Sequence, residues 1–279
     1  MRKSLIICEN NYYSSKKVAK IFSLILGMSK VIDIEDLSKY DDNYENVILI
    51  IGIHGMNNIQ NVKMYLEKNN LELRVGIIGV GITKKKLYES IDSLFSNMDK
   101  KIYAIELIKG KVDTKEVCTI ASKCSEIFNI PTLQLNKEEL SEEINKYVYK
   151  HNTCVLSTGF GKFVRSTPIE YIYEKGNFYF ITEGGIKFRG ILENSNVSIS
   201  IFDEYKGMKN LKGLQISGEA EILNNYNDEY IRVAKIKNID IGKIKNMPVN
   251  LNIIKVKVKK FEFLNSDFSK RCIDVKQIL

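Results

Sequence analysis

A glycine pair followed by two cations is the feature of this 279-residue sequence that most plainly indicates chemistry. Residues 176–191, GNFYFITEGGIKFRGI, begin with the alternation of a β-strand, break at Gly184 and Gly185, and then present Lys187 and Arg189 at the start of a short helical pattern over 188–194. Backbone N–H groups of a glycine turn and of a helix N-terminus favour an anion, as do the two cations. The pattern predicts an anion site, with a solvated turn as the alternative.

A second cation stands in the segment RSTP at 165–168, just before the glycine-containing stretch. Arg165 offers a charge, while Ser166 and Thr167 offer hydroxyl groups. Pro168 has no backbone N–H to donate to a sheet, so we expect this segment to be an edge strand that a ligand can approach. Together the two segments suit a phosphate dianion.

Composition limits the alternatives. Apolar residues make up 44% of the chain and charged residues 27%, as in a soluble globular protein, and the length suggests two domains. No stretch reaches the length of a membrane span or forms a signal peptide, so we expect a cytoplasmic protein. The net charge of +8 is interleaved with acids, and KVKVKK at 255–260 alternates like a strand with one solvated face, so we do not expect nucleic-acid binding. Five cysteines without a CxxC motif and two distant histidines predict reduced thiols and no metal site.

The chain changes its pattern near residue 136. Up to Pro131, buried apolar runs at 4–8, 46–52, 74–81 and 101–107 alternate with helical patterns starting at Ser14, Ile59, Lys84 and Thr114, which predicts a doubly wound α/β domain with a parallel sheet. Asn136 and Glu139 then form a capping box for a helix. From Cys154 onward nearly every segment reads as a strand, which predicts a closed or partly open antiparallel barrel. The expected domains are 1–135 and 137–279.

In this order of elements, residues 137–279 resemble the FMN-binding split-barrel family named after pyridoxamine 5′-phosphate oxidase. The quoted matches are TCVLST, VRSTPIEYIY, GNFYFITEGGIKFRGILENSNVSISIF and LQISGEAEIL. The resemblance implies that FMN is the cofactor and that the chain forms a homodimer with flavin in a groove shared by two barrels. The cofactor-binding residues that it implies are Arg165, Ser166, Thr167, Pro168, Ile181, Thr182 and Lys187. Loss of Lys187 should leave the fold intact, because a turn lysine contributes little to packing.

The chain also departs from that family. Gly185 and Ile186 stand where the family often has Ser followed by a cation, and Glu170 replaces a second basic residue of some members. The tail NSDFSKRCIDVKQIL lacks the Arg and His residues with which the true oxidase holds its substrate, so vitamin B6 oxidation is not expected. No residue stands out as a catalytic acid or base: Tyr171, Tyr173 and His54 are candidates only by residue type.

Residues 1–135 resemble a flavodoxin-type domain through CENNYYSSKKVAKIF, IIGIHGMNNIQNVKMYLEKN and ELIKGKVD. Ser14 and Ser15 retain hydroxyl groups at the expected phosphate loop. Glu9 replaces the usual Ser or Thr and Tyr13 the loop glycine, so we expect one FMN per chain, held by residues 137–279.

Three functions stay open from the sequence. The first is an FMN-dependent oxidoreductase acting on a small molecule, with NAD(P)H or a redox protein as electron source. The second is a non-enzymatic flavin-binding or electron-transfer protein, with the flavodoxin-like half as donor or docking surface. The third is an interaction protein that lacks FMN.

Overall fold

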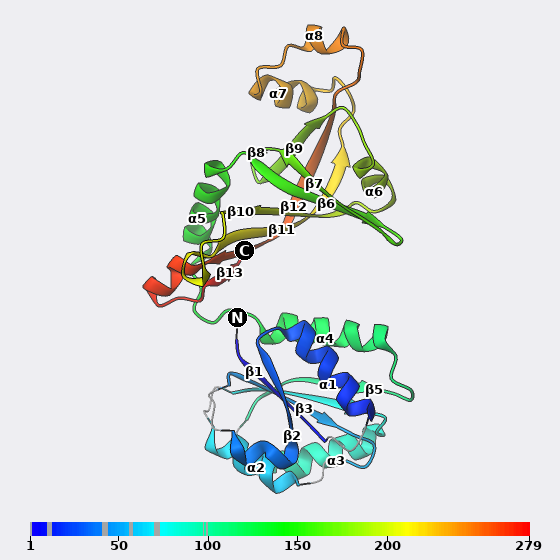
Figure 1. The fold of residues 1–279 in the computed structure, drawn as a ribbon, viewed down its shortest axis with the longest axis vertical. Helices are drawn as coiled ribbons and strands as arrows, with labels where there is room; N and C mark the ends of the chain where they lie inside the picture. Colours follow the sequence, from blue (N-terminus) through cyan, green and yellow to red (C-terminus); the bar gives the residue numbers. More distant parts are fainter. Residues whose placement is uncertain are drawn as a thin grey trace. The chain divides into compact units, whose positions relative to one another are not determined.

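The structure is a computed structural model that describes residues 2–9, 13–40, 44–55, 58–69, 73–96, 98 and 100–279. Two compact units divide the chain, unit 1 at Met1–Ile130 and unit 2 at Pro131–Leu279. This division lies a few residues before the boundary expected from the sequence. The two units are drawn in Figure 1 and are described one at a time.

Unit 1 is a parallel five-stranded sheet with helices on both faces. Its strands are β1 (Ser4–Cys8), β2 (Ser29–Asp33), β3 (Asn46–Ile51), β4 (Arg74–Val80) and β5 (Ile102–Ile108). Its helices are α1 (Tyr13–Leu26), the 3-10 helix η1 (Ile34–Lys39), α2 (Ile59–Lys68), α3 (Lys84–Phe95) and α4 (Thr114–Phe128). Every residue of β1 and β3 is buried, as expected of strands covered on both faces.

The helices of unit 1 form two layers. Helices α1 and α4 pack on one face of the sheet, and α2 and α3 cover the other (Figure 1). The strand order β2-β1-β3-β4-β5 is that of flavodoxin-like folds. The sequence analysis missed β2, because this edge strand is short and only Ile32 of its residues is buried.

Unit 2 is an antiparallel sheet in the order β7-β6-β10-β11-β12-β9-β8, with β13 paired to β12. The strands are β6 (Thr153–Phe160), β7 (Phe163–Glu170), β8 (Ile172–Glu174), β9 (Asn177–Thr182), β10 (Asn196–Phe202), β11 (Lys212–Ile222), β12 (Asn252–Asn265) and β13 (Lys276–Ile278). The helices are α5 (Lys137–Lys150), α6 (Lys187–Glu193), α7 (Asp228–Ile236) and α8 (Ile241–Lys245), with 3-10 turns η2 (Met208–Asn210) and η3 (Ser266–Arg271). The predicted α/β domain followed by a split β-barrel is confirmed.

One hydrophobic core fills the curled sheet of unit 2. Leu140, Ile144 and Val148 of α5 pack there against inward residues of the strands, including Phe178 and Phe180. The Asn136 side chain accepts the Glu139 N–H at 2.9 Å, as the predicted capping box requires. Strand β7 ends the strand order, which confirms the edge position predicted from Pro168.

Helices α7 and α8 are a correction to the sequence analysis, which placed no helix between the last two long strands. Apolar residues that alternate with lysines, as in IKNIDIGKIK, imitate a strand over this segment. The cap residues Asn227 and Asp240 each accept a backbone N–H and start a helix instead. Both helices pack in a separate cluster with Tyr179.

The lysines of β12 lie beside acids of β11. Lys255 and Lys257 approach Glu221 at 3.3 and 3.4 Å, and Lys259 approaches Glu219 at 2.5 Å. The acids of the segment GEAE at 218–221 therefore neutralise the basic run locally, and β12 does not form a continuous positive surface. Within the described ranges, no helix is long and apolar enough to cross a membrane.

Candidate functional site

The glycine turn and the start of α6 hold Lys187 in an unusual position. Gly185 has a φ of +110°, and a Cβ added there would lie 3.4 Å from the Lys187 ammonium nitrogen. The lysine side chain folds back under the turn and donates a hydrogen bond to the Gly184 carbonyl. Only 7% of Lys187 is exposed. The expectation of a turn lysine with little packing was wrong, because the chain folds around this side chain.

Arg165 is the second cation at this place. Burial lowers the pKa of the Lys187 ammonium most, the nearby charge of Glu183 opposes this shift, and the charge of Arg165 adds a smaller lowering. Unit 2 is described throughout, and within it neither Arg165 nor Lys187 forms an ion pair with a carboxylate. Both cations selected from the sequence therefore keep donors that a bound anion could use.

Two hydroxyl groups on the same strand pair lack a partner. Thr158 lies opposite Arg165 in the β6–β7 register, and its Oγ1 is buried without a hydrogen bond, as is Oγ1 of Thr167. Helix α6 lies directly on Thr158: a Cβ at Gly190 would come within 2.7 Å of the Thr158 Cβ and Oγ1. Buried hydroxyls normally find partners, so these two are available to a ligand.

Thr158 was missed by the sequence analysis. The signal that could have found it is the two-residue hairpin loop at Gly161 and Lys162, which places Phe160 opposite Phe163 and therefore Thr158 opposite Arg165.

The other predicted residues are divided between two faces. Successive residues of a strand point to opposite sides, so Ser166 and Pro168 face away from Arg165 and Thr167. The Ser166 hydroxyl lies 3.3 Å from that of Ser157. Ile181 and Thr182, the last residues of β9, are half-buried and pair with β12 at Ile253 and Asn252.

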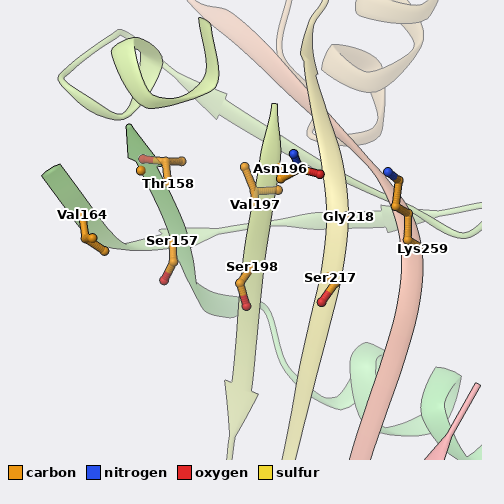
Figure 2. A pocket seen from close by; sticks show the side chains of 10 residues that line it. Ser157, Thr158, Val164, Asn196, Val197, Ser198, Ser217, Gly218 and Lys259 are labelled. Atoms are coloured by element: carbon orange, nitrogen blue, oxygen red, sulfur yellow. The ribbon is translucent and has the colours of Figure 1, made fainter. Parts of the chain in front are cut away.

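A shallow hollow of about 430 Å³ lies across β6, β10, β11 and β12 (Figure 2). Ser157, Ser198 and Ser217 stand opposite one another in successive strands and place a row of hydroxyls along it. The remaining lining residues are Thr158, Gly159, Val164, Asn196, Val197, Gly218 and Lys259. The hollow includes Thr158, but its serine row lies on the face of the sheet opposite to Arg165.

A β-bulge gives the hollow its ammonium group. The β11–β12 register shifts between Ser217 and Gly218, which leaves Lys259 without an opposing residue. A Cβ at Gly218 would lie 2.7 Å from the Lys257 carbonyl oxygen, so glycine is required there.

Tyr171 and Tyr173, which were candidate catalysts by residue type, form contacts that hold the fold together. Tyr171 donates its hydroxyl to the Val148 carbonyl at 2.6 Å, and burial raises its pKa. The Tyr173 ring packs against Phe178 at a tilted angle of 46°, and burial raises its pKa as well. No group of metal-binding side chains occurs among the described residues. The site therefore offers binding groups and no evident acid or base.

The corresponding edge of unit 1 carries opposite charge. Glu9 follows β1 and is 5% exposed, and Cys8 lies opposite Asp33 in the β1–β2 register. Burial, Asp33 and Glu9 raise the pKa of the Cys8 thiol to about 11, against a lowering by Lys16. The Ser15 hydroxyl is buried without a hydrogen bond, and Tyr13 is 83% exposed. Residues 10–12 and 56–57 of the compared loops lie outside the described residues.

Residues 140–265 match the family model described as pyridoxamine 5′-phosphate oxidase. Over these residues unit 2 resembles this family and has its split-barrel fold. A comparison with curated proteins found no match. The family match covers β6, β7 and α6, which carry Thr158, Arg165 and Lys187, so the cation pair and the unpaired hydroxyls lie in the matched part of unit 2.

Solved structures similar to this split barrel include three bacterial proteins. A putative pyridoxamine 5′-phosphate oxidase from Listeria innocua is 20% identical over 45% of this chain and 98% of its own, with a TM-score of 0.38. The heme storage protein HutZ from Vibrio cholerae is 15% identical over 43% of this chain and 90% of its own, with a TM-score of 0.37. An FAD-binding protein from Mesorhizobium loti is 13% identical over 43% of this chain and 91% of its own, with a TM-score of 0.36.

Proposed function

We propose that the split barrel binds FMN through its phosphate and that the protein is a cytoplasmic FMN-dependent oxidoreductase acting on a small molecule. The observation that carries this proposal is the pair Arg165 and Lys187, neither of which forms an ion pair with a carboxylate in unit 2, which the structure describes throughout. A phosphate would relieve their repulsion and accept hydrogen bonds from Thr158 and Thr167. The residues present therefore fit the group.

Bound FMN would supply hydride or electron transfer, and the chain would bind and orient it. Lys187 has further N–H donors beyond the one used on Gly184, and its burial excludes water from the charge it would neutralise. The hollow with its serine row would receive the reacting small molecule. The electron source is NAD(P)H or a redox protein. A non-enzymatic flavin-binding or electron-transfer protein is the second candidate, because Tyr171 and Tyr173, considered as acids or bases, are held in structural contacts.

The C-terminal tail supports the prediction that vitamin B6 is not the substrate. Its cations are already engaged: Lys270 pairs with Asp267 at 2.7 Å, and Arg271 pairs with Glu139. They are not directed to a second substrate phosphate.

Heme is less suited to this barrel than flavin. Of the two histidines in the chain, His151 belongs to unit 2, and both of its ring nitrogens have partners, Tyr147 O at 2.9 Å and Asp203 Oδ1 at 2.7 Å. Burial raises the pKa of the Cys154 thiol to about 12, so it is not a thiolate ligand at neutral pH.

A homodimer would complete the site. The outward face of β6, β7, β10 and β11 carries Ser157, Ser166, Ser198 and Ser217, short side chains that let a second copy approach closely. Strand β7 is also an open edge that a partner would cover. We expect a dimer by light scattering at micromolar concentration with FMN present, and no nucleic acid in the complex. A monomer under these conditions would count against the shared flavin groove.

The test titrates the full chain with FMN, riboflavin and hemin, following flavin fluorescence and heme absorbance. FMN should bind at least about tenfold more tightly than riboflavin, as expected from one charge-assisted hydrogen bond to phosphate. Equal affinities would refute the phosphate site, and tight hemin binding with no flavin binding would refute the flavin assignment. Bleaching of the bound flavin by NADH or NADPH under anaerobic conditions would support the enzyme. An unreactive yellow protein would support the second candidate.

A further inference from the structure

Two adjacent loops of unit 1 carry a cluster of exposed lysines at the carboxyl edge of the sheet. After β4, a turn at Gly81 leads to Lys84, Lys85 and Lys86 in the first turn of α3. After β5, Lys109 and Lys111 flank Gly110 before α4 begins. The Gly81 N–H donates to the Ile108 carbonyl at 2.9 Å, so the two loops start side by side. We call these five lysines the basic edge.

Few acids balance the basic edge. Lys85 approaches Glu89 at 3.9 Å, and Asp113 uses its carboxylate to accept the Glu116 N–H at 3.0 Å as the cap of α4. In the part of unit 1 that the structure describes, no carboxylate pairs with Lys84, Lys86, Lys109 or Lys111. All five lysines are exposed. Positive charge is therefore concentrated on one side of this unit.

Helix stability does not explain the arrangement at α3. Cations in the first turn oppose the helix dipole, at a cost of about 0.3–1 kcal/mol each at low salt. Helix α5, by contrast, starts with Glu138 and Glu139, and α4 is capped by Asp113. Three consecutive lysines at the start of α3 weaken that helix, so a binding role accounts for them better than folding does.

The basic edge is distinct from the position where flavodoxin-like folds hold their ligand. That position lies between β1 and β3, where the strand order reverses, and here it borders the buried carboxylate Glu9. The basic edge lies beyond β4 and β5, on the other side of β3. It is therefore not a remnant of a flavin phosphate loop.

We propose that the basic edge of unit 1 docks the acidic face of a partner protein. Lysine ammoniums on flexible stems act as solvated point charges, which suits charge steering between two protein surfaces. Glu89 and Asp113 stand among the lysines, so the surface is mixed, and a protein partner can match both signs. A phosphodiester backbone offers negative charge alone and would meet those carboxylates unfavourably. This proposal does not depend on flavin binding by unit 2.

The experiment compares two full-length variants with the same loss of charge. The first carries Lys84→Gln, Lys86→Gln, Lys109→Gln and Lys111→Gln. The control carries Lys20→Gln, Lys30→Gln, Lys63→Gln and Lys101→Gln, lysines of unit 1 that lie outside the basic edge. The probes are a fluorescein-labelled glutamate peptide of about 20 residues, standing for an acidic face, and a labelled thymidine oligonucleotide of similar charge, both followed by anisotropy at low and physiological salt.

Binding of the glutamate peptide should weaken about tenfold in the first variant and less than about threefold in the control, since four exposed charge contacts contribute roughly 0.2–1 kcal/mol each. Equal loss in both variants would overturn the proposal, because net charge alone would then explain binding. Tighter binding of the oligonucleotide than of the peptide, lost in the first variant, would also overturn it and assign the surface to nucleic acid. Thermal melting checks the fold, and the first variant should melt no lower than the wild-type protein, since it relieves the dipole conflict in α3.

Discussion

Each unit of this chain has buried hydroxyl groups without a hydrogen-bond partner, but the charges beside them differ. In unit 1, the buried carboxylate Glu9 follows β1, and Ser15 in α1 has an unpaired hydroxyl. In unit 2, Thr158 and Thr167 also have unpaired hydroxyls, and they lie with Arg165 and Lys187. Both units thus have unpaired hydroxyls, so we expect the sign of the nearest charge to decide which of the two places takes a phosphate.

The difference also shows that burial of a charge has opposite consequences in the two units. A buried carboxylate repels a phosphate through a medium of low effective dielectric, whereas a buried ammonium attracts it through the same medium. Sequence resemblance alone assigns both halves to flavin-binding folds. Glu9 already distinguishes them in the sequence, and the structure adds that Glu9 and Lys187 are both buried.

The largest expected effect concerns the number of flavins. The full chain should bind one FMN per chain, because a carboxylate ~6 Å from a phosphate dianion costs on the order of 4–5 kcal/mol at an effective dielectric of ~20, while serine hydroxyls return roughly 1–2 kcal/mol. Equilibrium dialysis of the wild-type chain measures the stoichiometry. Glu9→Gln removes the repulsion and should allow a second FMN to bind more weakly. Two FMN bound per wild-type chain would show that the two units do not differ in flavin binding.

The second effect concerns the cation pair. Lys187→Ala should weaken FMN binding by roughly 1.5–3 kcal/mol, about ten- to a hundredfold, and Arg165→Ala should act in the same direction. The matched control is Arg189→Ala, because Arg189 already pairs with Glu193 at 2.8 Å and stacks over Phe160. Fluorescence titration should show the control within about threefold of the wild-type protein. Unchanged affinity in both single variants would show that the phosphate lies elsewhere.

The third effect tests how α6 is held beside Arg165. Gly190→Ala places a methyl group 2.7 Å from Thr158, and such overpacking should lower the free energy of unfolding by about 1–3 kcal/mol. Gly213→Ala is the control, since the nearest atoms to its Cβ lie at 3.6 Å, an ordinary contact. Urea unfolding with and without FMN measures both. If Gly190→Ala unfolds like the control, α6 is free to shift and the cation pair is not fixed by this contact.

The smallest expected effect concerns the pKa of Cys8, which the acidic side chains at the edge of unit 1 help to raise. The pKa of Cys8 is raised from 9.0 to about 11, so its thiol keeps its proton at pH 8, where exposed Cys272 reacts. The folded protein favours the protonated thiol of Cys8. The free energy of unfolding is therefore fully retained below pH 9 and falls as the pH rises toward 11. Iodoacetamide with peptide mapping should label Cys272 first and Cys8 only on unfolding. Glu9→Gln should lower the pKa of Cys8, and faster labelling of Cys8 than of Cys272 at pH 8 would contradict the raised pKa.

Much of the fold could be predicted from apolar patterns. Runs such as NVILIIG can be buried on both faces only in a parallel sheet, and the capping pair Asn136 and Glu139 fixed the start of α5. Strand β2 and helix α7 escaped prediction for different reasons. The first is too short and exposed to show a period, and the second is only nine residues long and is followed by a segment, IKNIDIGKIK, that looks like a strand.

Only part of the site could be predicted, because the pairing of β6 with β7 decides which side chains meet there. Arg165 and Lys187 carry signals in their residue types, but the burial of Lys187 follows from how the chain folds back at Gly185. Thr158 carries no signal of its own and gains a role only because the hairpin sets it opposite Arg165. Side-chain chemistry is readable from sequence, whereas the pairing of strands that assembles it has to be established from the structure.

Strand β12 has a consequence for how the protein is made. Its 14 residues pair with β11 on one side and with both β9 and β13 on the other. On the ribosome, unit 1 has its whole sheet available once residues 1–130 have emerged. The split barrel must wait until residue 265 is synthesised, with β9 and β11 exposing unpaired edges until then. The chaperone demand of this protein should therefore fall late in translation, on unit 2.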